Sequence, residues 1–138
     1  MIKAEDLRIG DLVRYGEQVT TIHAVYYKLI DDFVVVEGTF CISCKDLEPI
    51  PITTEILEKN GWKLITYDFN HVCFVHRNTD VFNLKVLSKG ECLKVELDLM
   101  PSYARICNHT LSIPKNIKYV HELQHILWAF GMDANFKI

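Results

Sequence analysis

The sequence feature that most constrains the fold is the break Pro49-Ile50-Pro51. Proline cannot donate a hydrogen bond to a β-ladder, and it holds the residue before it in an extended conformation. Short runs of alternating and β-branched residues precede the break, whereas a helix start follows it at once. The break therefore predicts two parts, residues 1–52 and residues 53–138, joined near residues 48–52.

The first part, residues 1–52, has the pattern of a small all-β unit. Strand-like runs at 11–15, 18–27, 33–36 and 39–43 are separated by turn residues such as Gly16 and the pair Asp31-Asp32. Four or five short strands with tight turns are typical of a small closed barrel. The opening stretch Leu7-Arg-Ile-Gly-Asp-Leu-Val13 looks like the entry strand of SH3-like barrels. We therefore expect an N-terminal SH3-like β-barrel.

The second part, residues 53–138, mixes helix and strand patterns. A helix is predicted near 53–60, because Thr53 can cap its start and Gly61 can end it. Alternating runs at 64–67, 71–76, 81–87 and 93–99 follow, with hairpin-type connections between them. A second and stronger helix is predicted near 117–131, with Asn116 as its cap. These patterns predict an antiparallel β-sheet packed on two helices, and therefore an α+β protein.

The second helix contains His121-Glu122-Leu123-Gln124-His125, which matches the H-E-x-x-H pattern of zinc hydrolases. The pattern places two imidazoles one helical turn apart and a glutamate general base between them. One hypothesis is therefore a zinc-dependent hydrolase in which His121 and His125 bind the metal and Glu122 acts as the base.

The ligand count argues against this hypothesis, because such a site needs a third protein ligand. Downstream of His125 the chain contains no histidine or glutamate, and only Asp133 could serve. The upstream alternatives are His71, His76 and His109.

The helix periodicity also argues against a zinc site. One apolar arc is formed by Tyr119, Leu123, Ile126, Leu127 and Phe130. The two histidines fall opposite this arc, beside Trp128 and Met132. We therefore expect a structural helix with outward histidines and no bound metal.

The five cysteines are Cys41, Cys44, Cys73, Cys92 and Cys107. The odd count and the absence of an export signal predict reduced thiols that pack as small hydrophobic groups. Cys41-Ile-Ser-Cys44 resembles half of a zinc knuckle, but a separation of three residues along a strand points the two thiols to opposite faces. There is no second Cys-x-x-Cys pair. The sequence therefore predicts no cofactor.

Charge and hydropathy restrict the partners. Residues 1–48 contain five Lys or Arg and nine Asp or Glu residues, a balance of −4, which argues against nucleic-acid binding. No apolar run approaches the ~18 residues that span a bilayer, and the chain start has no signal-peptide core. We therefore expect a cytoplasmic protein without a membrane span.

A protein or peptide partner could contact exposed aromatic residues, for which the candidates are Tyr15, Tyr26, Tyr27, Phe33 and Trp128. The alternative is that these rings fill the core.

Three stretches carry a resemblance to a known group of proteins: Leu7 to Val13, Asp46-Leu-Glu-Pro-Ile-Pro-Ile-Thr53 running to Gly61-Trp62, and Lys118-Tyr-Val-His-Glu-Leu-Gln124. In these stretches the chain resembles small uncharacterised proteins of gut-bacterial (Bacteroidetes-type) genomes and their phages or mobile elements. The group has no assigned activity, so the resemblance implies no catalytic residues. It implies that the last helix is a scaffold feature. The expected function is a non-enzymatic cytosolic binding or accessory protein, with the zinc hydrolase as the alternative.

Overall fold

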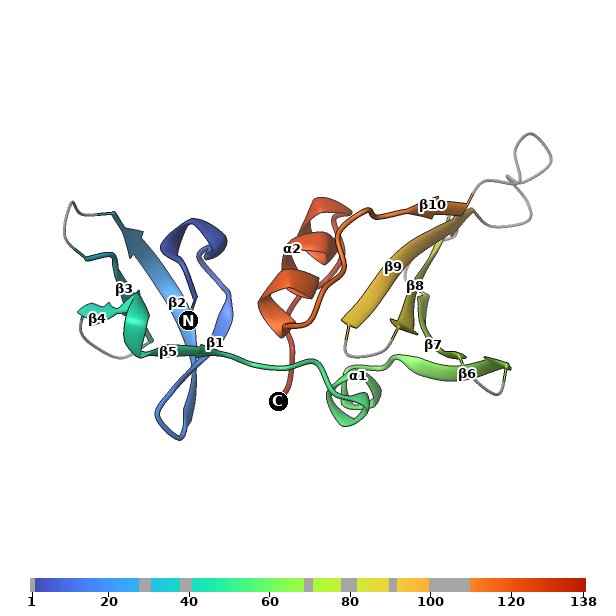
Figure 1. Ribbon diagram of the computed structural model, residues 1–138, viewed down its shortest axis with the longest axis horizontal. Coiled ribbons are helices and arrows are strands. Elements are labelled where there is room, and N and C mark those ends of the chain that lie inside the picture. The colour runs from blue at the N-terminus through green and yellow to red at the C-terminus, as the bar shows by residue number, and fades with distance from the viewer. Residues whose placement is uncertain are drawn as a thin grey trace. The chain divides into compact units, whose positions relative to one another are not determined.

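The computed structural model describes residues 2–27, 31–37, 41–68, 71–77, 82–89, 92–99 and 110–138. The chain forms two compact units. The first unit contains residues 1–51, 119–136 and 138, and the second contains residues 52–118 and 137. Each unit holds one five-stranded antiparallel sheet and one α-helix (Figure 1). The α+β class predicted from the sequence is therefore confirmed.

The sheet of the first unit has the order β4-β3-β2-β1-β5. Its elements are η1 (Ala4–Asp6), β1 (Leu12–Tyr15), β2 (Gln18–Tyr26), β3 (Phe33–Val36), β4 (Cys41–Ser43), η2 (Cys44–Asp46), β5 (Leu47–Pro49) and α2 (Val120–Ala129). In the described residues β4 and β5 are the two edges, and no closed barrel is found. Alternate residues of the strands point inward, and the core is formed by Ile2, Ala4, Leu7, Val13, Ile22, Val34, Val36, Cys44 and Leu47.

The sheet of the second unit has the order β10-β9-β8-β7-β6. Its elements are α1 (Thr54–Lys59), β6 (Lys63–Asp68), β7 (His71–Arg77), β8 (Phe82–Lys89), β9 (Cys92–Leu99) and β10 (Thr110–Ser112). The predicted cap of α1 is present, because the Thr53 hydroxyl accepts a hydrogen bond from the Ile56 amide. The predicted end is also present, because Gly61 adopts a φ of 82° directly after the helix.

The last helix, α2, lies in the first unit, although the sequence analysis assigned it to the second part of the chain. The Val120 amide donates a hydrogen bond to the Ile50 carbonyl, and Pro51 and Tyr119 form an isolated β-bridge. The helix also contacts β1. The physical reason is that the inward face of α2 is partly polar and finds its partners in residues 8–12, as described below. No helix in the described part of the chain is long and apolar enough to cross a membrane.

Candidate functional site

The most polar buried site of the first unit begins at a tight turn between Arg8 and Asp11. The Asp11 amide donates to the Arg8 carbonyl at 3.2 Å, and the Arg8 amide donates to Asp11 Oδ2 at 2.7 Å. Gly10 adopts a φ of 95°, a conformation that side-chain-bearing residues rarely adopt. Two hydrogen bonds with Ile22 tie the turn to β2. This geometry holds the Asp11 carboxylate in a fully buried position.

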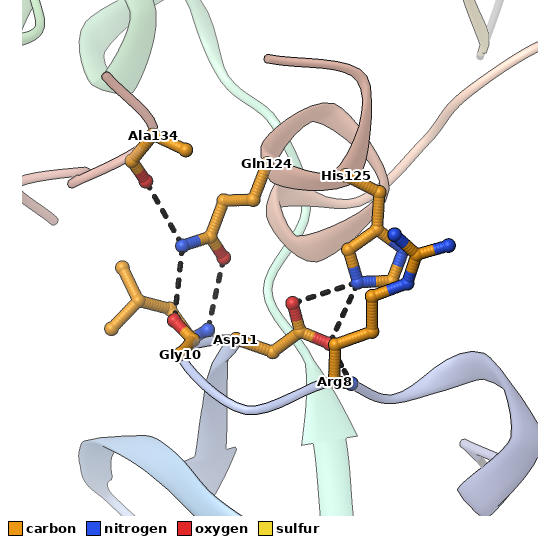
Figure 2. Close-up of polar contacts among 7 residues, drawn as sticks. Arg8, Gly10, Asp11, Gln124, His125 and Ala134 are labelled. Atoms are coloured by element: carbon orange, nitrogen blue, oxygen red, sulfur yellow. Dashed lines mark hydrogen bonds and ion pairs between the residues drawn. The ribbon is translucent and has the colours of Figure 1, made fainter. Parts of the chain in front are cut away.

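His125, on α2, is the main partner of this buried carboxylate. Its Nε2 atom lies 2.8 Å from Asp11 Oδ1 and 2.9 Å from Asp11 Oδ2 (Figure 2). A buried carboxylate without a partner strongly destabilises a fold, so it needs such a contact. Asp11 and His125 therefore join the N-terminal turn to a helix that lies 114 residues later in the chain.

Gln124 makes a second connection from the same helix (Figure 2). Its Oε1 atom accepts from the Leu12 amide at 3.0 Å. Its Nε2 atom donates to the Gly10 carbonyl at 3.2 Å and to the Ala134 carbonyl at 3.0 Å. The side chain is buried, so this carboxamide satisfies two main-chain groups of the N-terminal turn and one main-chain group that follows α2.

A row of rings continues along the helix from the Asp11 contact. His121 stacks on Tyr119 with a centroid separation of 5.9 Å and meets His125 edge-on at 6.0 Å. Trp128 stacks on the other side of His125 at 5.8 Å. Trp128 also lies over Gly10, where an added Cβ would come within 3.1 Å of the indole. Gly10 is thus required both by the turn and by the close approach of Trp128.

His121 is buried with an unpaired nitrogen. Its side chain is 4% exposed, and its Nδ1 atom has no hydrogen-bond partner among the described residues. Burial lowers the pKa of His121 below its ordinary value, because desolvation disfavours the charged ring. The carboxylates of Asp11, Glu122 and Asp6 oppose this lowering, while the His125 ring adds to it. His121 is therefore held neutral to lower pH than an exposed histidine.

This lowered pKa predicts an acid-dependent loss of stability. As the pH falls through about 6.5, His121 becomes protonated in the unfolded chain, whereas its ring stays neutral in the folded chain because its pKa there is lower. The free energy of unfolding should then fall by up to about 1.4 kcal/mol per pH unit until the lowered pKa is reached. Urea denaturation at several pH values measures this slope.

Two histidine variants test that assignment. His121→Asn should flatten the slope below about pH 6.5, because the titrating group is gone. His23→Asn is the matched control, because His23 is exposed on β2, and it should keep the slope of the unmodified chain. Equal slopes in all three proteins would contradict the burial of His121 as the cause.

Two expectations about the face of α2 are wrong. We expected both histidines on the outer face and Phe130 on the inner one. Instead His121 is buried, His125 contacts the buried Asp11, and Phe130 is 37% exposed. Leu123 and Leu127 are buried, as expected. The difference arises because α2 packs on the polar turn at residues 8–12, so its inward face is not its most apolar arc.

The residues of the H-E-x-x-H motif serve the start and the docking of α2. Glu122 Oε2 accepts a hydrogen bond from the Tyr119 amide at 3.2 Å, a contact that satisfies an otherwise unpaired donor at the helix start. His125 uses Nε2 to bind Asp11. Within the described ranges, no three His, Cys, Asp or Glu side chains are placed to hold a metal ion. Of the upstream ligands considered, His71 and His76 lie on β7, and His109 falls outside the described residues.

Three of the five aromatic candidates lie at one end of the first unit. Tyr26 is directly opposite Phe33 in the β2–β3 register, and Tyr27 follows Tyr26. Tyr26 is 52% exposed and Tyr27 is 65% exposed. Tyr15 is also exposed, but it lies at the opposite end of β2, beside Gln18. Trp128 belongs to the ring row on α2.

The two described thiols are free and differ in environment. Cys41 on β4 is exposed, whereas Cys44 in η2 is buried. Burial, followed by the nearby Asp32 carboxylate, raises the pKa of the Cys44 thiol and so keeps it protonated. Cys73 and Cys92 lie on β7 and β9, and Cys107 falls outside the described residues.

Asp11 and Gln124 were not among the candidates from the sequence. Gly10-Asp11 is a recognisable turn pair, and Gln124 lies within the motif that was considered for zinc. Neither signal shows that the two residues meet.

The chain matches no protein-family model, no curated protein and no solved structure.

Proposed function

We propose that the chain is a non-enzymatic cytosolic binding or accessory protein of the phage or mobile-element type that its sequence resembles. In this proposal the first unit is SH3-like and binds a protein or peptide through the outer face of β2 and β3. The observation that carries the proposal is the exposed Tyr26 ring, which lies directly opposite the half-buried Phe33 ring on the outer face of β2 and β3.

The topology of the first unit supports an SH3-like fold. Its sheet runs β4-β3-β2-β1 as a meander of sequential strands, and β5 returns to pair with β1. The short helix η2 lies directly between β4 and β5. Five short antiparallel strands in this order are compatible with a small, strongly bent β-sheet unit.

The outer face of β2 and β3 carries a cluster of apolar residues. Val34 and Val36 are buried on the inner face of β3, which assigns Phe33 and Val35 to the outer face. The register places Val35 opposite Ala24, next to the pair Tyr26 and Phe33. An antiparallel sheet with one solvated face normally carries polar residues there, so this apolar patch supports a binding surface.

The zinc-hydrolase alternative lacks comparable support. The Glu122 carboxylate accepts a hydrogen bond at the start of α2, and His125 Nε2 contacts Asp11. Both contacts favour a structural role for the motif, and the proposed function includes no metal.

Selection of random peptides on the immobilised chain tests the proposed surface. We expect enriched peptides that bind the unmodified chain and the Tyr15→Asp variant equally well. Tyr26→Asp should weaken their binding by about tenfold or more, because a charge replaces an aromatic contact. Tyr15 is a matched control, since it is a similarly exposed tyrosine at the far end of the same hairpin. Failure to enrich any peptide, or binding that Tyr26→Asp leaves unchanged, would contradict the proposal.

A further inference from the structure

Charge is distributed unevenly between the two units of the chain. The first unit, residues 1–51, 119–136 and 138, contains five Lys or Arg and eleven Asp or Glu residues, a balance of −6. The second unit, residues 52–118 and 137, contains ten Lys or Arg and seven Asp or Glu residues, a balance of +3. The net charge of −3 for the whole chain therefore conceals a strongly acidic first unit. A surface of this sign attracts cationic partners and repels acidic ones.

Glu37 brings this negative charge to the apolar surface on β2 and β3. Phe33 and Val35 lie on the outer face of β3, and Glu37 occupies the next alternate position. The Glu37 amide donates to the Thr21 carbonyl at 3.0 Å, so the antiparallel pairing with β2 continues to this residue. The Glu37 side chain is exposed. Phe33, Val35 and Glu37 therefore form a line in which two apolar side chains are followed by a carboxylate.

The two ends of this line differ in whether their carboxylate already has a partner. Asp31, two residues before Phe33, forms an ion pair with Lys45. Glu37 forms no ion pair and no side-chain hydrogen bond within the described residues. Glu37 can therefore accept a cation from a partner without losing an existing contact, and such a charge contributes to the specificity of binding.

On the basis of the binding surface proposed above, we propose that the partner is a basic peptide segment of another protein. An apolar side chain of this segment contacts Tyr26, Phe33 and Val35, and a Lys or Arg side chain contacts the Glu37 carboxylate. Residues two apart on a strand are separated by about 6.5 Å, so neighbouring side chains of one peptide can reach both Val35 and Glu37. The −6 balance of the first unit adds a longer-range attraction for such a segment and disfavours acidic segments.

Three peptide libraries test the chemistry of the partner. Alternate positions are fixed as lysine, glutamate or glutamine, the other positions are random, and peptides are selected on the immobilised full chain at physiological salt. We expect enrichment from the lysine library. The enriched peptides should bind Tyr26→Ala about tenfold or more weakly, because this variant removes the ring without adding a charge. Raising the salt concentration should also weaken their binding, because salt screens exposed charges.

Glu37→Gln and Glu17→Gln are a matched pair, because each removes one charge from an exposed glutamate of the first unit. Glu37→Gln should weaken the binding of the lysine peptides by about two- to fivefold, the range of an exposed ion pair. Glu17→Gln should leave it unchanged. Glu17 lies four residues before Thr21, roughly 13 Å along the strand direction, which exceeds the Debye length of ~8 Å at physiological salt. Equal losses in the two variants would overturn the contact with Glu37.

The libraries separate failure of the basic partner from failure of the proposed surface. Peptides from the glutamate or glutamine library could bind as tightly as the lysine peptides and lose affinity for Tyr26→Ala. That result would overturn the basic partner and leave the binding surface intact. The absence of any peptide that Tyr26→Ala weakens would overturn both.

Discussion

Asp11→Ala should destabilise the first unit by about 3 to 5 kcal/mol, the range expected when one partner of a buried ionisable pair is removed. The Asp11 carboxylate accepts hydrogen bonds from the Arg8 amide and contacts His125 Nε2, and it has no access to water. Its removal leaves the buried end of the turn without an acceptor and leaves the His125 ring without its partner. Urea denaturation followed by far-ultraviolet circular dichroism measures the loss, because tryptophan fluorescence would also report Trp62 of the second unit.

A double-mutant cycle separates the contribution of the pair from that of the turn. If the contact between Asp11 and His125 is real, Asp11→Ala and His125→Ala should be coupled by about 0.5 to 3 kcal/mol. Asp46→Ala serves as the matched control, because Asp46 is an exposed aspartate of the same unit, and it should change stability by less than about 0.5 kcal/mol. Additive effects of the two variants would mean that Asp11 acts through the turn alone.

The local elements could be predicted from the sequence because their causes are local. Thr53 and Gly61 bound α1 through a side-chain cap and a positive φ, both of which depend on a few neighbouring residues. Eight of the strands in the two sheets follow from period-two alternation, since the core requires one apolar face. The short strands β5 and β10 lie outside the predicted runs. The placement of α2 could not be predicted in this way. Periodicity reports which residues share a face of a helix, but it does not report what that face meets.

The candidate site likewise combines a local feature that the sequence indicates with a long-range contact that the sequence does not indicate. The turn at Gly10-Asp11 has a local signal, whereas its contact with His125 spans 114 residues and leaves no periodic trace. The expected apolar inner face also misplaced His121 and Phe130, since the buried side of α2 carries His121 and Gln124 beside apolar residues such as Leu123. The stretch that matches H-E-x-x-H does lie in the candidate site, but the contacts that place it there are structural. The side chains of this stretch mainly serve the start and the docking of a helix.

Gln124→Leu should destabilise the first unit by about 3 kcal/mol or more, because three main-chain groups lose their partner at once. The groups are the Leu12 amide, the Gly10 carbonyl and the Ala134 carbonyl. Leucine has a similar volume, so the effect reports lost hydrogen bonds rather than a cavity. Each unpaired buried group costs about 1 to 3 kcal/mol, and the amide of Leu12 should also exchange its hydrogen faster with solvent.

Gln18→Leu is the matched control for this loss, since Gln18 is an exposed glutamine on β2. It should leave the free energy of unfolding within about 0.5 kcal/mol of the unmodified chain. A Gln124→Leu variant as stable as Gln18→Leu would show that the carboxamide does not hold α2 to the N-terminal turn. If the predicted loss is found together with faster exchange at Leu12, the docking of α2 depends on this polar contact. The scaffold role implied for the last helix would then have a specific physical basis: a glutamine and a histidine on adjacent positions bind one turn near the start of the chain.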